Sequence, residues 1–265
     1  MDPGESVGDP QGGPGESGPS RAGEKREALL ESLRDAGLLG QVRVGVPLPA
    51  EPSPYPRRDS ADSLPHPRTT APGLDSVLRP LERSAQGRLI ELAGPPSSGR
   101  TALAYRLAAG TAARGEWVGW VDPGNALDPR FLRRTGLDLR QLLWVRPRRI
   151  EAALRCAELL LKTGFALVVI DLDDAPDASR SIASQLPAAV WVRLLRAVRG
   201  ARATTVLIAR ERVTGSFATL GLCTERAHAL FDRGLFEGLE GFAQVVRNRT
   251  GPSETELPFR VLQRP

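Results

Sequence analysis

A glycine-rich turn is the segment whose residue types and spacing point most directly to chemistry. Residues 94–101 read Gly-Pro-Pro-Ser-Ser-Gly-Arg-Thr, which fits the phosphate-binding pattern G-x-x-x-x-G-K-[S/T] with Arg in place of Lys. In such a turn backbone N–H groups face a phosphate chain, and the start of the following helix adds partial positive charge. The pattern predicts that the phosphates of a nucleotide are held by Gly94, Ser97, Ser98, Gly99, Arg100 and Thr101.

A metal ion would accompany those phosphates. The Thr101 hydroxyl is placed to bind Mg²⁺, and Asp171 closes the apolar run at residues 167–170, where P-loop proteins hold the metal through an aspartate. Arg100 is bulkier and more planar than the usual lysine, so it cannot simply replace an ammonium beside the phosphates. An alternative stays open, in which the turn binds no ligand and Arg100 fills the phosphate site.

The composition limits the class of protein. The formal net charge is +5 and the sequence pI is about 10.0, which favours an acidic partner such as nucleic acid or an acidic protein surface. Arginine supplies almost all of this charge, an excess that compositional drift explains equally well. Cys156 and Cys223 stand apart, without zinc spacing, and indicate buried thiols. Without a signal peptide or a membrane-length apolar run, we expect a cytoplasmic protein and no membrane partner.

The elements that must position the turn divide the chain into four parts. Residues 1–23 are rich in Gly, Pro and Ser and predict a disordered tail. Residues 24–40 predict an amphipathic helix, and the proline-rich residues 41–72 predict a linker. Residues 73–265 predict one core domain.

The core alternates strands and helices. Apolar strands are predicted at residues 89–93, 117–121, 166–170 and 204–209, and helices at residues 101–114, 148–163 and 186–198. This order is typical of an α/β fold with a mostly parallel sheet flanked by helices. Four later strands, at residues 217–222, 225–231, 241–247 and 257–262, predict an antiparallel extension at the C-terminal end.

With these motifs placed, the chain resembles the RecA recombinases from about residue 73 to residue 262. The turn at residues 94–101 is similar to the RecA form, as are residues 120–131, residues 136–143 and the Val-Val-Arg-Asn-Arg stretch at residues 245–249. The resemblance ends before RecA's separate C-terminal domain. It implies a RecA-like P-loop core that uses ATP and Mg²⁺. It further implies that Asp128 contacts adenine, Phe131 stacks on it, and Arg247 and Arg249 reach the phosphates of a neighbouring subunit.

The departures from RecA concern hydrolysis and DNA contact. Gly124 stands where the family has its catalytic glutamate, and Arg210 stands near its glutamine switch. The two loops that grip DNA in RecA look shortened or rewritten at residues 173–185 and 211–217. Because glycine cannot polarise a water molecule, we expect no catalytic residue, and ATP binding with weak or no hydrolysis.

A smaller group resembles the chain more closely. ImuA-type proteins, with their SulA-like relatives, share the Arg-containing turn and the phrase at residues 115–122. This resemblance implies an accessory role in translesion synthesis during the SOS response. Its partners would be an ImuB-like polymerase homologue and an error-prone polymerase, with DNA, a homo-oligomer or an assembly with RecA as further candidates. The alternatives are an active DNA-dependent recombinase, in which Asp173 or Asp174 supplies the acid, and a nucleotide-free adaptor or cell-division inhibitor.

Overall fold

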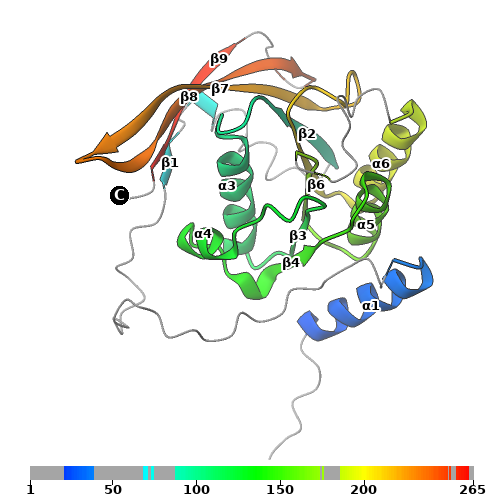
Figure 1. Ribbon diagram of the computed structural model, residues 1–265. Helices are drawn as coiled ribbons and strands as arrows, with labels where there is room; N and C mark the ends of the chain where they lie inside the picture. The colour runs from blue at the N-terminus through cyan, green and yellow to red at the C-terminus, as the bar shows by residue number, and fades with distance from the viewer. Residues whose placement is uncertain are drawn as a thin grey trace, which may run out of the picture.

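The architecture was obtained from a computed structural model. It describes residues 21–38, 68–70, 73–74, 87–173, 175, 186–249, 251 and 255–262. Within these ranges the chain forms one large sheet with helices on both faces (Figure 1). Nearly all of the predicted tail and most of the predicted linker lie outside the described residues.

The sheet is mostly parallel. In chain order its strands are β1 (Arg68–Thr70), β2 (Arg88–Ala93), β3 (Val118–Val121), β4 (Leu142–Val145), β5 (Leu167–Asp171), β6 (Thr204–Ala209), β7 (Leu220–Asp232), β8 (Leu235–Asn248) and β9 (Glu256–Leu262). Their spatial order is β1-β9-β8-β7-β2-β6-β5-β3-β4. Neighbours from β7 to β4 are parallel, whereas β8, β9 and β1 pair antiparallel. The predicted α/β class with antiparallel strands at its C-terminal end is confirmed.

Helices cover the two faces of the parallel strands. They are α1 (Arg21–Asp35), α3 (Arg100–Ala113), α4 (Pro129–Arg134), α5 (Ile150–Lys162) and α6 (Ala188–Ala201), with a short 3-10 turn, η2 (Leu139–Gln141). Strand β5 shows why its sequence is apolar throughout. Val168 packs in one core with α5 and α6, whereas Val169 packs in the other core with α3. Since both faces are buried, no position in the run is left for a polar residue.

Helix α1 docks on α5 of its own chain. The leucines Leu33 and Leu38 are almost fully buried in the core that α5 lines. Gly37 ends the helix with φ 67°, and the Leu38 N–H donates to the Leu33 carbonyl at 2.8 Å. This left-handed glycine cap with an apolar contact across it is a Schellman motif, which places Leu38 back against the helix.

Three details differ from the expected elements. Of the two strands predicted at residues 217–222 and 225–231, residues 220–222 and 225–231 belong to one strand, β7, that continues into a long hairpin with β8, whereas residues 217–219 precede it. Arg233 and Gly234 turn the hairpin with φ 48° and 79°, as a tight two-residue loop requires. Strand β4 and helix α4 were not predicted because both are short. Strand β1 lies inside the segment predicted as a linker.

Both thiols are poorly reactive in the fold. Cys156 is buried, and burial raises the pKa of its thiol to about 12. Burial also raises the pKa of the half-buried Cys223 thiol. The nearby Arg212 charge partly opposes this shift, and the Glu91 charge adds to it. Because the thiolate is the nucleophile, we expect Ellman's reagent at pH 8 to label Cys223 slowly and Cys156 only after unfolding. Fast labelling of both thiols in the native protein, or of Cys156 in a Cys223→Ser variant, would contradict this packing.

Across the described ranges, no helix combines the length and the apolar character that crossing a membrane requires.

Candidate functional site

The glycine-rich turn connects β2 to α3 at the carboxyl end of the parallel strands. Ser97 and Gly99 have φ 60° and 92°, and α3 begins at the next residue, Arg100. A methyl group on Gly94 would lie 2.3 Å from the Thr224 carbonyl oxygen, and one on Gly99 would lie 2.5 Å from the Phe259 ring. The two motif glycines are therefore also required by the strands that pack behind the turn.

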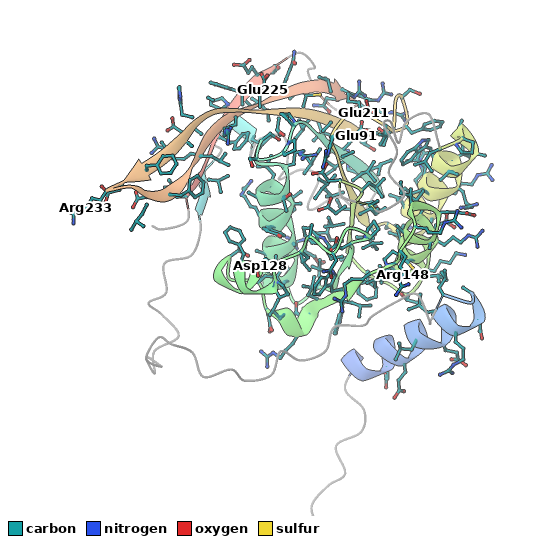
Figure 2. The ribbon with its side chains drawn as sticks, viewed as in Figure 1. Glu91, Asp128, Arg148, Glu211, Glu225 and Arg233 are labelled. Carbon is teal, nitrogen blue, oxygen red and sulfur yellow. The ribbon has the colours of Figure 1, made fainter. Side chains whose placement is uncertain are left out.

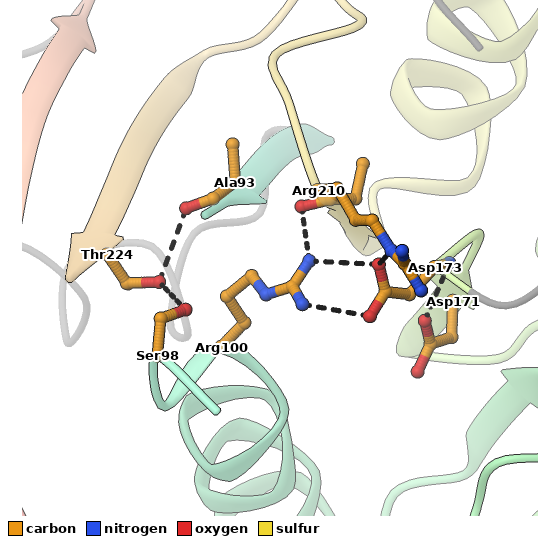
Figure 3. A network of polar contacts seen from close by, with 8 residues as sticks. Ala93, Ser98, Arg100, Asp171, Asp173, Arg210 and Thr224 are labelled. Carbon is orange, nitrogen blue, oxygen red and sulfur yellow. Dashed lines mark hydrogen bonds and ion pairs between the residues drawn. The ribbon is translucent and has the colours of Figure 1, made fainter. Parts of the chain in front are cut away.

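A hydroxyl pair ties the turn to β7. Ser98 Oγ lies 2.7 Å from Thr224 Oγ1, which in turn donates to the Ala93 carbonyl oxygen at 3.2 Å (Figure 3). Ser98 is buried, whereas Ser97 is exposed. Of the two predicted serines, Ser98 thus serves to hold the turn in place, and Ser97 faces outward.

The Arg100 side chain runs from the start of α3 to the ends of β5 and β6. It is 3% exposed. Its Nη1 donates to the Ala209 carbonyl oxygen at 2.6 Å, and Nη1 and Nη2 bracket the Asp173 carboxylate at 3.3 and 2.8 Å (Figure 3). Arg210 Nε donates to the same carboxylate at 2.9 Å. The guanidinium predicted to face phosphates is therefore engaged by an internal anion.

Asp171 closes β5 as predicted and lies beside this pair (Figure 3). Burial raises the pKa of its carboxyl to about 7. The Asp173 backbone N–H, donating at 3.1 Å, works against this shift, while the Asp122 and Asp173 carboxylates add to it. A nearby divalent cation would reverse that balance, because it stabilises the ionised form. Within the described ranges, no three His, Cys, Asp or Glu side chains gather into a metal site.

Asp122 shapes the turn that contains Gly124. Its fully buried carboxylate accepts hydrogen bonds from the Ala126 N–H, the Leu127 N–H and Trp144 Nε1 at 2.9–3.0 Å. These three hydrogen bonds give the Asp122 carboxylate a structural role, which is to hold the turn. The Asp-Pro-Gly-Asn sequence of the segment is a turn signal that could have indicated this role.

A cavity of about 290 Å³ opens beside the turn. It is lined by Ser97, Ser98, Gly99, Arg100, Thr101, Ala102, Tyr105, Phe131, Phe236, Gly238, Leu239 and Val261. One wall is thus the turn and the first part of α3, and the opposite wall is the β8–β9 sheet. Sequence reasoning found the first wall and Phe131 but missed the second, because no local pattern shows which residues of a distant hairpin face a loop.

An aromatic cluster contributes Tyr105 and Phe131 to the lining of the cavity. Phe131 packs on Tyr105 with ring centroids 5.5 Å apart, and Tyr105 packs on Trp120 at 5.0 Å. Burial raises the pKa of Tyr105, whose hydroxyl is hydrogen-bonded to the Asp128 backbone. Asp128 also begins α4, since its carbonyl oxygen accepts from Leu132 N at 3.0 Å. Asp128 and Phe131, which were predicted to contact adenine, thus both contact Tyr105 of α3, the helix that follows the turn.

The two predicted C-terminal arginines bond within their own chain. Arg247 Nε donates to the Ala218 carbonyl oxygen at 2.8 Å, and Arg249 Nη2 donates to the Ser216 carbonyl oxygen at 2.5 Å. Both therefore stabilise the loop after β6, the second of the two loops predicted to be rewritten. Most of the first, residues 173–185, lies outside the described residues.

Glu91 holds the same loop from within the sheet. This fully buried carboxylate accepts from Val213 N, Thr214 N and Thr214 Oγ1 at 2.6–2.8 Å, and Arg212 Nε lies 3.5 Å away. Figure 2 shows Glu91 and Glu211 at the same end of the sheet, far from Arg233 at the hairpin tip. Sequence reasoning missed Glu91, although a lone acid inside an apolar strand is a signal of a buried polar role.

Comparison with known proteins agrees with this architecture. Residues 70–193 match the RecA N-terminal domain family. Protein RecA of Ruegeria pomeroyi is 26% identical over 205 residues, which cover 66% of this chain and 59% of that protein. These matches and the fold support membership of the RecA-like recombinase superfamily. Protein RecA of Parvibaculum lavamentivorans is 29% identical over 206 residues, covering 67% of this chain and 56% of the relative.

The fold itself has a solved counterpart in this superfamily. The RadB recombinase structure matches with a TM-score of 0.53 at 23% identity, covering 71% of this chain and 93% of that chain. The chain spans less than three fifths of the length of the RecA proteins cited above. These comparisons show the fold and support the family, and the activity is a proposal that rests on the site.

Proposed function

We propose that the protein is a RecA-like accessory protein of DNA repair that binds ATP with Mg²⁺ and hydrolyses it weakly or not at all. The observation that carries this proposal is the state of the carboxylates around the turn. The Asp122 carboxylate accepts three hydrogen bonds, two from its own turn and one from Trp144, and Asp173 is bound by two arginines. Gly124 stands at the family's glutamate position, and Asp171, the other carboxylate beside the turn, is proposed as a ligand of Mg²⁺ rather than as a base for water.

The residues that would hold the ligand fit a triphosphate through the backbone rather than through Arg100. The left-handed Ser97 and Gly99 and the start of α3 border a cavity that Tyr105 and Phe131 also line. Thr101 and Asp171 are the residues offered to Mg²⁺, which when bound would neutralise phosphate charge. Asp128 and Phe131 would contact the adenine, as the resemblance to RecA implies. Arg247 and Arg249 would have to leave the Ala218 and Ser216 carbonyl oxygens to reach a neighbouring subunit's phosphates.

The finer role proposed is an assembly factor in damage-induced translesion synthesis. It rests on the combination of the RecA-like core, Arg100 and Gly124 that is similar to ImuA-type proteins. An ImuB-like polymerase homologue and an error-prone polymerase are the partners to test. Co-expression followed by size-exclusion chromatography should yield a complex with the polymerase homologue, and its absence at micromolar concentrations would remove this role.

A nucleotide-free adaptor is the second candidate, and one observation favours it. The Arg100 guanidinium is already neutralised by Asp173, so the turn lacks the free cation that P-loops offer to phosphates. An active recombinase is less well supported. Asp173 is held by two arginines, and Asp174, the other acid considered, lies outside the described residues.

One titration with a turnover assay separates these possibilities. We expect fluorescent ATP to bind in the presence of Mg²⁺ and turnover to fall on the order of 10²–10⁴ below that of an enzyme with its base in place. Adding single-stranded DNA should not restore turnover. Robust DNA-stimulated hydrolysis would establish the recombinase, and no binding at millimolar nucleotide would establish the adaptor.

A further inference from the structure

The contact between Arg100 and Asp173 has a geometry that phosphate would share. The guanidinium meets the two carboxylate oxygens side by side, with Nη2 to Oδ2 at 2.8 Å and Nη1 to Oδ1 at 3.3 Å. Carboxylates and phosphates are recognised by arginine through the same bidentate fork. Asp173 therefore occupies the side of Arg100 that a phosphate oxygen would use.

Burial makes the choice between these two anions exclusive. Arg100 is 3% exposed and Asp173 is 15% exposed, so water screens the pair weakly. A buried guanidinium without an anion is costly, and Arg100 can leave Asp173 only when another anion takes its place. The Asp173 carboxylate and a phosphate chain thus compete for one side chain.

A second arginine makes it easier for Arg100 to leave Asp173 than it would be in a lone ion pair. Arg210 Nε also donates to Asp173, at 2.9 Å, and its side chain is 58% exposed. If Arg100 turned toward a ligand, Arg210 would still neutralise Asp173. The carboxylate therefore has a second cation, whereas Arg100 has a carbonyl oxygen, that of Ala209, as its other neighbour.

We infer that Asp173 is a positioning residue that withholds Arg100 from the phosphates of a nucleotide and so lowers the affinity of the glycine-rich turn for polyphosphate. This inference rests on the proposed function and identifies the side chain that limits it. The turn would hold phosphate by its backbone alone until Arg100 is released.

The test measures binding of Mg²⁺-ATP and of inorganic pyrophosphate by calorimetry to four folded proteins. These are the wild type, Asp173→Asn, Asp173→Asn combined with Arg100→Ala, and the control Asp138→Asn. Asp138 forms a similar two-oxygen pair with Arg140, but on the exposed surface. Asp173→Asn should bind both ligands about tenfold more tightly, equivalent to about 1.4 kcal/mol. The control should bind as the wild type does, and the double variant should lose the gain.

That dependence on Arg100 separates positioning from a general effect on the fold. If the gain persisted without Arg100, or if Asp173→Asn bound no more tightly than a binding-competent wild type, the inference would be overturned while the proposed function stood. If only Asp173→Asn bound nucleotide, the inference would hold and the wild type would be an adaptor. If neither bound, both would fail.

A second variant leaves Asp173 in place, in case its replacement prevents folding. Arg100→Lys keeps the charge but cannot span both carboxylate oxygens and the Ala209 carbonyl together. We expect it to bind pyrophosphate more tightly than the wild type. Equal or weaker binding by a folded Arg100→Lys protein would count against the inference independently of the aspartate.

Discussion

Replacing Glu91 with alanine is expected to lower the free energy of unfolding by about 3–5 kcal/mol, because it removes the buried partner of several polar groups. The Glu91 carboxylate is fully buried and accepts from Val213 N, Thr214 N and Thr214 Oγ1. Without it, those donors stay buried and unpaired, and Arg212 loses the anion at 3.5 Å. Urea unfolding followed by tryptophan fluorescence would measure the loss.

Two matched variants make this prediction sharper. Glu91→Gln keeps an acceptor oxygen at the same place, so it should cost about 1 kcal/mol, near the net value of one hydrogen bond. Glu225→Ala removes an exposed acid from β7 and should stay within about 0.5 kcal/mol of the wild type. If Glu91→Ala were as mild as Glu225→Ala, the bonds that hold the loop after β6 would not contribute to stability.

A methyl group on Gly99 is expected to lower the free energy of unfolding by about 2–5 kcal/mol and to abolish nucleotide binding. Two causes add. The φ of 92° is unfavourable for alanine, and the new carbon would lie 2.5 Å from Phe259 Cε2. Relief requires either the turn or β9 to move, and both line the cavity. Urea unfolding and a titration with fluorescent ATP would measure the two effects.

Gly115 provides the control for backbone strain alone. Its φ is 77°, yet no atom lies within 4 Å of the position that a methyl group would take. Gly115→Ala should therefore cost about 1–2 kcal/mol and leave nucleotide binding unchanged. Placing Gly99→Ala in a Phe259→Ala background should recover part of its cost, because the clash is gone. Equal costs for the two glycines would show that Phe259 does not press on the turn.

Much of the fold was accessible from local patterns. Continuous apolar runs such as residues 167–170 occur where a parallel strand is covered on both faces, and this predicted β5 between its two helical layers. The short edge strand β4 and the strand β1 escaped prediction, because a strand of three or four residues carries too little periodicity. Strand β7 was divided in two at Cys223 and Thr224, although both residues lie within the strand and pair with β8.

In the candidate site, too, the local features were predictable from the sequence and the long-range contacts were not. The spacing of the glycine-rich turn and the position of Asp171 after a buried strand follow from neighbouring residues, and the chain alone was sufficient to predict them. The partner of Arg100 was not predictable, because Asp173 lies 73 positions further along and meets Arg100 only where β5 and β6 end together. The same holds for Thr224 against Ser98 and Phe259 against Gly99.

A local motif therefore determined that a glycine-rich turn would lead from β2 into α3, since φ preferences and helix starts act over a few residues. Only the tertiary structure decided which anion its arginine meets. The register of β5 and β6 brings carboxylates that are distant in the sequence to the carboxyl ends of these strands. A guanidinium buried there has to pair with the nearest carboxylate.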